Sequence, residues 1–212
     1  MHSRTGLECL RALKKSSNTN VHAFCRDKTK LFNEVCSSIV TGNARSATDL
    51  ERAIVATKAD TVIISVGNGD SVKKSDIRTV SGKALASIMQ KPTFQNLRVL
   101  VVSSAGAGSS KIIVGMGIGM LISYHLKYVL KDHTGQELAF SSPDVKRRTC
   151  IVRASSLVDN KATGNLVTYG DEVKGPSIET DRADLAAWIA DKVCGPVEEF
   201  GGRTFNVTTG KK

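Results

Sequence analysis

Short apolar runs alternate with amphipathic stretches along this chain, and no other feature of the sequence restricts the fold as strongly. Three runs are VHAFC (21–25), TVIISV (61–66) and RVLVVSS (98–104), and SSIVT (37–41) and TCIVRA (149–154) are weaker examples. Runs without strict polar alternation are typical of parallel strands that helices cover on both faces. Strand and helix alternate at least four times, which predicts a doubly wound α/β fold around a parallel sheet.

The amphipathic stretches carry apolar side chains at helical spacing, so we expect a helix over each of them. In the second stretch, Thr48 and Glu51 have the spacing of a capping box. The stretches are GLECLRALKK (6–15), ATDLERAIVATKAD (47–60), SDIRTVSGKALASIMQ (75–90), GQELAF (135–140) and DRADLAAWIADKV (181–193).

Length and charge narrow the class of protein. A chain of 212 residues is expected to form one domain (1–212) that buries its own core. Lys and Arg number 30 and Asp and Glu 20, so the formal net charge is +10. This excess favours an anionic ligand or surface, for which nucleic acid, phospholipid and a phosphorylated cofactor all qualify. The basic residues are dispersed and no nucleic-acid-binding motif accompanies them, so we do not expect nucleic acid as the partner.

Cysteine usage and the start of the sequence bear on location. The five cysteines are scattered, without a C-x-x-C pair or a Cys/His cluster. We therefore expect reduced thiols, no metal site and a cytoplasmic protein. The first residues contain no apolar segment typical of a secretory signal, and an organellar location stays open if a further segment precedes them.

The longest uncharged run covers residues 112–126 (IIVGMGIGMLISYHL). Its 15 residues are too few to span a bilayer, so we expect no membrane span and interpret the run as a buried or lid segment, with contact to a membrane surface as the alternative. The glycines of VGMGIGM (114–120) follow four expected strands, whereas the glycines of a dinucleotide fingerprint follow the first. We interpret them as flexible or closely packed backbone.

Ligands of such sheets bind at the carboxyl ends of the strands. Arg26 follows the first run, where an arginine suits the 2′-phosphate of NADP, although a solvated turn is the plainer interpretation of an isolated charge. After Val66, Gly67 allows close approach of backbone to a ligand or forms a turn. Ser103 and Ser104 can hydrogen-bond a substrate carbonyl or a nicotinamide, or satisfy a turn.

The order of these segments resembles the atypical short-chain dehydrogenase/reductases of the NmrA-like, NAD(P)H-binding type, the group that includes biliverdin reductase B-like proteins. The resemblance extends over nearly the whole chain. It is carried by RTGLECLRAL, VHAFCRDKTKL, ADTVIISVG, RVLVVSSAGAGSS, the long run DHTGQELAFSSPDVKRRTCIVRASSLVDNKATG, and IETDRADLAAWI, in that order.

This resemblance implies a Rossmann domain, monomeric or a weak dimer, that binds NADP, with NAD the weaker candidate. It also implies a small organic substrate at a variable substrate or lid segment around residues 106–131. By position in the family's motifs, Ser103 and Ser104 stand on the catalytic side. The cofactor-binding positions are Arg4, Thr5 and Gly6 in the phosphate turn, Arg26, Asn43, Val66, Gly67 and Arg153.

The sequence departs from the family at several positions. Asn43 replaces the usual aspartate, and Ala154 replaces a proline. No Tyr-x-x-x-Lys pair is present, so the proton relay of ordinary short-chain dehydrogenases is not indicated. Tyr124, His125 and His133 are candidate proton donors, although a core or surface position is the plainer interpretation of each.

The family begins with a strand and a G-x-x-G-x-x-G turn, whereas this sequence begins near the third glycine, Gly6. We therefore expect the sheet to lack its first, central strand, which leaves a gap beside the strand at 21–25. A truncated chain, a sheet that closes up, and a degenerate relative that does not bind the cofactor all account for this. For function, we expect an NADP(H)-dependent oxidoreductase that acts by hydride transfer. The alternatives are a redox sensor that binds NAD(P) without turnover and a fragment that cannot bind it.

Overall fold

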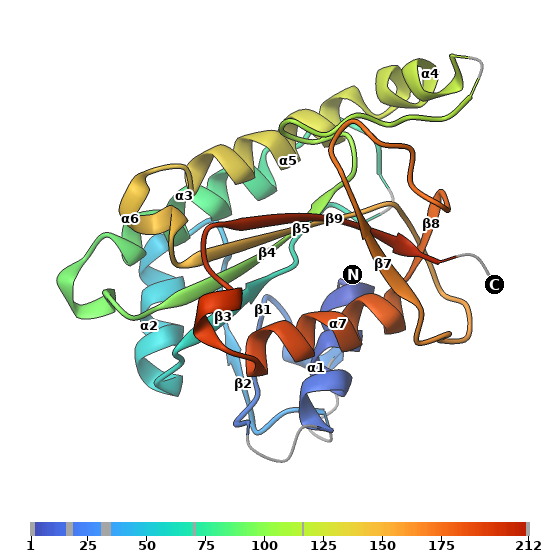
Figure 1. The fold of residues 1–212 in the computed structure, drawn as a ribbon. Coiled ribbons are helices and arrows are strands. Elements are labelled where there is room, and N and C mark those ends of the chain that lie inside the picture. The colour runs from blue at the N-terminus through green and yellow to red at the C-terminus, as the bar shows by residue number, and fades with distance from the viewer. Residues whose placement is uncertain (1–2, 16–18, 31–34, 70, 116, 211–212) are drawn as a thin grey trace.

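The computed structural model describes residues 3–15, 19–30, 35–69, 71–115 and 117–210. Its helices and strands follow the expected alternation through the first two-thirds of the chain (Figure 1). In chain order they are α1 (Arg4–Lys14), β1 (His22–Cys25), η1 (Lys28–Lys30), β2 (Ser38–Thr41), α2 (Ala47–Thr57), β3 (Thr61–Ile64), α3 (Ile77–Met89), η3 (Pro92–Phe94), β4 (Arg98–Ser104), α4 (Ile118–His125), α5 (Lys127–Ala139), α6 (Pro143–Lys146), β5 (Thr149–Ala154), β6 (Ser156–Val158), β7 (Leu166–Tyr169), β8 (Glu179–Asp181), α7 (Arg182–Cys194), η4 (Val197–Glu199) and β9 (Arg203–Thr209).

The main sheet has five strands in the order β3-β4-β5-β9-β7. The pairs β3–β4, β4–β5 and β5–β9 are parallel, and β7 runs antiparallel to β9 at the edge. Helices α3 and α5 pack together on one face, and α1 and α7 pack together on the other (Figure 1). The expected doubly wound α/β fold is therefore confirmed, and its sheet is parallel except at the edge strand β7.

Strand β4 contains four consecutive apolar residues, 99–102, because both of its faces are covered. Val99 and Val101 belong to the core under α3 and α5, whereas Leu100 and Val102 belong to the core under α1 and α7. Successive side chains of a strand point to opposite faces, and both faces are covered here, so all four of these positions are apolar. The first core also contains Leu85, Ile88 and Phe140, and the second contains Leu185, Ile189 and Phe200.

Strands β1 and β2 form a separate two-stranded parallel sheet, and the described residues contain no ladder that joins β1 to β3. A cavity of about 650 Å³ lies between β1 and β3 and is lined by both strands together with parts of α1 and α2. The gap that the sequence predicts beside the strand at 21–25 is therefore present in the described structure. A third, small sheet pairs β6 with β8.

The start of α2 corrects one expectation. The N-cap is Ser46, whose hydroxyl accepts a hydrogen bond from the Asp49 amide at 3.2 Å, and the Thr48/Glu51 pair plays no capping role. The carboxylate of Asp49 instead accepts the amide of Asn43 at 2.8 Å. Ser46 and Asp49 lie two residues before Thr48 and Glu51 and have the chemistry of a helix start. The helix therefore begins two residues earlier than the Thr48/Glu51 pair predicts.

Candidate functional site

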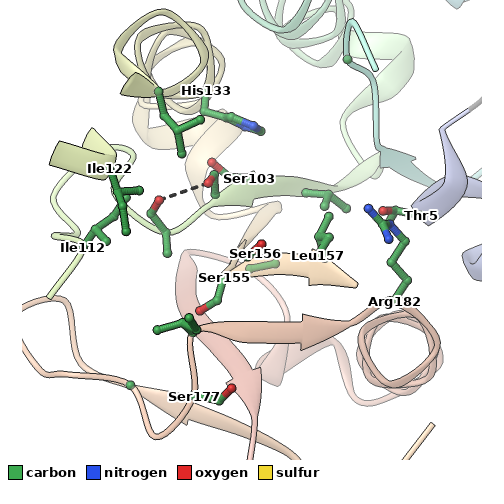
Figure 2. A pocket seen from close by; sticks show the side chains of 18 of the residues that line it. Thr5, Ser103, Ile112, Ile122, His133, Ser155, Ser156, Leu157, Ser177 and Arg182 are labelled. Carbon is green, nitrogen blue, oxygen red and sulfur yellow. Dashed lines mark hydrogen bonds between the residues drawn. The ribbon is translucent and has the colours of Figure 1, made fainter. Parts of the chain in front are cut away.

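A cavity of about 660 Å³ lies at the carboxyl ends of β3, β4 and β5. Figure 2 shows Thr5 and Arg182 at one end of it, Ile112 and Ile122 at the other, and Ser103 between them. The first end is formed by the starts of α1 and α7, and the second by the segment that leads into α4. The cavity therefore has a polar, basic end and an apolar end.

The charge of the lining is one-sided. Four basic residues line the cavity, namely Arg4, Arg78, Lys111 and Arg182, whereas no aspartate or glutamate occurs among its described lining residues. Each of these cations is paired with a carboxylate that lies outside the lining, so the charged groups that face an anion in the cavity are the basic ones.

Two helices begin at the basic end. Ser3 caps α1: its hydroxyl accepts the Gly6 amide at 3.1 Å and lies 2.9 Å from the Ser65 hydroxyl, which fixes the helix start to the end of β3. Helix α7 begins at Arg182, and its N-cap is Asp181. The N-terminus of a helix carries partial positive charge, so both helices add to the attraction for an anion.

Arg4 and Arg182 share one carboxylate. Their guanidinium groups donate to the two oxygens of Asp159 at 2.7 and 2.6 Å. The hydrogen bond from Arg182, with the added charge of Arg4, holds the pKa of Asp159 below its usual range. The shared carboxylate therefore holds both guanidinium groups at the same corner of the cavity.

Ser103 lies at the end of β4 and is almost fully buried. Its hydroxyl donates to Glu137 Oε1 at 2.6 Å. Glu137 is in turn fixed by Arg153, whose Nε and Nη2 donate to Oε1 and Oε2 at 3.0 and 2.8 Å. Because the hydroxyl proton points to Glu137, the Ser103 oxygen offers its lone pairs to a donor group in the cavity.

His133 of α5 forms the roof of the cavity above Ser103 (Figure 2). Burial, with a contribution from the charge of Arg78, lowers the pKa of His133 to about 3. The ring is therefore neutral near pH 7 and is not an acid in the imidazolium form. Arg78 lies under the end of β3, where a Cβ on Gly67 would stand 2.6 Å from its Nη2. Glycine at this position leaves room for the guanidinium.

Comparison with protein families assigns this architecture. A family model described as NAD(P)H-binding matches residues 2–194. The chain belongs to the NAD(P)H-binding family. Among curated protein sequences, none matches the chain at a significant level.

Solved structures show the same Rossmann fold as this NAD(P)H-binding protein. A candidate NAD-dependent epimerase/dehydratase from Bacillus halodurans superposes with a TM-score of 0.74 at 21% identity, covering 99% of this chain and 91% of its own. A short-chain dehydrogenase/reductase from Veillonella parvula in complex with NADP gives 0.73 at 15% identity, with coverages of 97% and 90%. ChuY, an anaerobillin reductase from Escherichia coli O157:H7, gives 0.70 at 18% identity, with coverages of 97% and 91%.

The cavity suits the cofactor class of this NAD(P)H-binding family. A dinucleotide carries its negative charge on phosphates, and the basic lining with two helix starts is the environment that phosphates favour. The residues that would hold the diphosphate are Arg4, Thr5 and Arg182, at the starts of α1 and α7.

The structure brings six of the ten expected site residues to this cavity. They are Arg4, Thr5, Val66, Gly67, Ser103 and Ser104. Ser104 donates its hydroxyl proton to the Ala105 carbonyl at 3.1 Å, so it also satisfies the turn that was its alternative interpretation.

The other four expected residues lie outside the described lining of this cavity. Gly6 lines the second cavity, between β1 and β3. Arg26 is exposed after the end of β1, and Asn43 is exposed in the turn after β2. Arg153 is buried, and its guanidinium is bound by Glu137 and by Asp171 Oδ1 at 3.0 Å. Contacts of these four residues with a cofactor stay predictions.

Several lining residues were not predicted. Ser155 directly follows β5, so the rule that selected Ser103 would also have selected it. Arg182 follows the N-cap Asp181, which is a recognisable helix-start signal. Arg78 and Tyr169 carry no such signal, because tertiary packing brings them to the cavity.

The uncharged run at 112–126 departs from its interpretation as a buried segment. Met120, Leu121 and Tyr124 on α4 are strongly exposed, although Ile112 and Ile122 line the cavity. Close packing is confirmed at Gly119, where a Cβ would overlap the carbonyl oxygen of Ile112. Of the candidate proton donors, Tyr124 and His125 are exposed outside the described lining, and His133 lies in it.

The described part of the chain has neither a metal-ligand cluster nor a helix suited to span a membrane. It contains no group of three or more His, Cys, Asp or Glu side chains arranged to hold a metal ion. In the same ranges, no helix is both long and apolar enough to cross a membrane.

Proposed function

We propose that this chain is an NADP(H)-dependent oxidoreductase that transfers hydride between the nicotinamide and a small organic substrate. One observation carries the proposal: in an NAD(P)H-binding Rossmann fold, the strand-end cavity is lined by four basic residues and by no described carboxylate. The bound cofactor would supply the hydride. The protein would bind it, orient it and exclude water.

The polar contacts suggest how the two ends divide the work. Arg4, Arg182 and the starts of α1 and α7 would bind the diphosphate. Ser103, whose oxygen can accept a hydrogen bond, would orient an amide donor such as the carboxamide of the nicotinamide.

Tyr169 is the side chain in the lining that we assign to the substrate's proton. Its hydroxyl lies 3.3 Å from the Ser155 hydroxyl, and both residues line the cavity at the ends of β7 and β5. A phenol held in this way can donate a hydrogen bond to a carbonyl oxygen and release the proton as negative charge develops there. Neutral His133 would serve as a hydrogen-bonding partner.

The far end of the cavity indicates the character of the substrate. Ile112, Ile113, Ile122 and Leu126 form an apolar wall there. A pocket of this kind favours an apolar, drug-sized carbonyl compound or quinone over a sugar or an amino acid.

The preference for NADP rests on Arg26, which stands at the carboxyl end of β1 with its side chain exposed. A guanidinium matches the geometry of a 2′-phosphate, whereas NAD gives it no partner. The NADP complex of the Veillonella parvula protein is in line with this preference.

A redox sensor that binds NADP(H) without turnover is the second candidate. The observation that favours it is the lack of a Tyr-x-x-x-Lys pair, since Tyr124 lies exposed on α4 and Lys127 follows it at the wrong spacing. Turnover separates the two functions.

Both functions are tested by titrating the full chain with NADPH and NADH while following nicotinamide fluorescence. We expect NADPH to bind at least ten-fold more tightly, and Arg26→Ala to reduce that preference. Equal affinities would contradict the assignment of Arg26. A screen with quinones, flavins and aldehydes then follows NADPH oxidation: sustained oxidation excludes the sensor, and binding without oxidation of any of them favours it.

A further inference from the structure

Helix α4 presents an apolar surface to solvent. Met120, Leu121 and Tyr124 are the three most exposed large apolar or aromatic side chains among the described residues, at 75%, 71% and 71%. Their spacing of one, three and four positions places them on one side of the helix, which we call the α4 face. Figure 1 shows α4 at the periphery of the molecule, beyond the body of the sheet.

The segment around α4 separates two kinds of side chain. Ile112, Ile122 and Leu126 turn inward and line the strand-end cavity, so the fold of this segment does not depend on burying the α4 face. A contiguous exposed apolar surface next to a ligand cavity is typical of a contact site.

The lysines and the lack of acidic residues give the segment that carries the α4 face charges of one sign. Residues 111–131 contain Lys111, Lys127 and Lys131 and no acidic residue. Lys111 is paired with Glu172 at 2.6 Å, but within the described ranges no ion pair involves Lys127 or Lys131. The ammonium of Lys127 stands 4.3 Å from the ring centre of Tyr124, so the cation and the aromatic ring lie side by side.

We propose that the α4 face docks this protein on an anionic bilayer surface. Apolar side chains lie beside lysines here, and a tyrosine lies next to both kinds of residue. This pattern is typical of a helix that lies in the membrane–water interface without crossing the bilayer. The lysines attract anionic headgroups, and the overall charge of +10 acts in the same direction.

A second copy of the chain fits the same surface less well. A two-fold dimer through α4 would place Lys127 and Lys131 of one copy near the same residues of the other. Like charges in that position repel, whereas a surface of phosphatidylserine headgroups is complementary to them.

Cosedimentation of the full chain with vesicles tests the proposal and needs no bound cofactor, so its failure is distinct from a failure of the proposed function. We expect binding to vesicles of phosphatidylcholine mixed with phosphatidylserine, much weaker binding to phosphatidylcholine alone, and loss of binding as salt rises. The Met120→Ser/Leu121→Ser variant should lose at least about ten-fold in affinity for the mixed vesicles.

The matched control is Val55→Ser, because Val55 is 59% exposed on α2, away from the α4 face. It should bind vesicles like the unaltered chain. The Lys127→Gln/Lys131→Gln variant keeps the apolar side chains and should lose the preference for phosphatidylserine. NADPH affinity should stay unchanged in the serine variant, since neither Met120 nor Leu121 lines the cavity.

Three results would overturn the proposal. The first is no binding to the mixed vesicles, and the second is binding that the serine variant retains. The third is a dimer in analytical ultracentrifugation that the same variant dissociates, which would assign the α4 face to contact between copies.

Discussion

At the scale of single residues, the site depends on charged side chains that are buried and paired. Arg153 and Glu137 are each less than a tenth exposed and form a two-pronged ion pair beneath the cavity. Ser103 joins this pair through its hydroxyl, so the orientation of a serine at the cavity depends on a glutamate outside it. Removing Glu137 leaves Nε and Nη2 of the buried Arg153 without their carboxylate, while Nη1 keeps its contact with Asp171.

Glu137→Ala should therefore lower the free energy of unfolding by about 3–5 kcal/mol, as measured by urea denaturation. Glu172→Ala is the matched control, because it removes an ion pair with Lys111 that is mostly exposed. That change should have an effect of about 1 kcal/mol or less. Equal losses in the two variants would mean that the Glu137–Arg153 pair adds no more to stability than an exposed ion pair.

The carboxyl group of Asp184 makes the stability of the fold depend on pH. Burial raises the pKa of this carboxyl, but hydrogen bonds from the Thr163 and Gly164 amides and the Thr163 hydroxyl outweigh it, so the pKa is lowered overall. A group with a lowered pKa stabilises the fold above its unfolded pKa, about 4, and loses that contribution as the pH falls through the folded value.

Asp184→Asn should cost about 1–3 kcal/mol at pH 7, because the amide cannot accept all of these bonds. The difference in unfolding free energy between the two proteins should stay constant from about pH 7 to 5 and shrink below about pH 4. A difference that grows on acidification would contradict the sign assigned to Asp184.

At the scale of helices and strands, α3 depends on a cap from another helix. Its N-cap Asp76 makes no side-chain capping bond. Asp132 of α5 supplies one, accepting the amides of Arg78 and Thr79 at 3.2 and 2.9 Å. The same carboxylate lies 3.5 Å from Arg78 Nη1, so one residue fixes both the helix start and a cavity arginine.

Asp132→Ala should destabilise the fold by about 3 kcal/mol, since it removes the cap and leaves Arg78 buried without its carboxylate. Asp132→Asn retains an oxygen for the Thr79 amide and should cost clearly less. Thermal unfolding of both variants checks this order. If the alanine and asparagine variants unfold at the same temperature, the capping bonds do not contribute.

The sequence predicted the elements whose partners lie close by or whose pattern is apolar, and it missed those fixed by distant polar contacts. Strand β9 went unrecognised because its buried residues include Asn206 and Thr208. Asn206 donates to Asp171 at 2.7 Å, and Thr208 donates to the Glu179 carbonyl at 2.7 Å. These partners lie dozens of residues away, so local hydrophobicity cannot reveal a strand there.

The candidate site divides in the same way. Residues at strand ends, such as Ser103 and Gly67, could be located because strand direction alone fixes their edge of the sheet. Arg78 and Arg182 reach the cavity from helices, and their position depends on how those helices pack. The exposed side of α4 agrees only with the alternative interpretation of its run, contact with a membrane surface, because an uncharged run is interpreted as buried by default.

At the scale of the whole molecule, the two parallel sheets should differ in stability. β4 is hydrogen-bonded to a neighbour on each side and packed on both faces. Within the described ranges, β1 pairs with β2 alone and borders a cavity of about 650 Å³. Regions with few buried apolar contacts open first in native-state exchange.

Amide hydrogen exchange should therefore show the β1–β2 sheet exchanging about ten-fold faster than β4 and β5, or more. The experiment resolves peptides from each sheet by mass spectrometry. Uniform protection across the two sheets would mean that the molecule opens as a single cooperative unit, contrary to this expectation.

The central claim is that the basic end of the strand-end cavity binds the diphosphate of NADP(H), and calorimetric titration of NADPH tests it most directly. The unaltered chain should bind one NADPH. The Arg4→Ala/Arg182→Ala variant should bind about 100-fold more weakly, because two charge-assisted contacts are lost. Arg147→Ala, which removes an exposed arginine paired with Asp144 away from the cavity, should bind NADPH normally. No heat of binding from the unaltered chain, or equal affinity in the double variant, would contradict the claim.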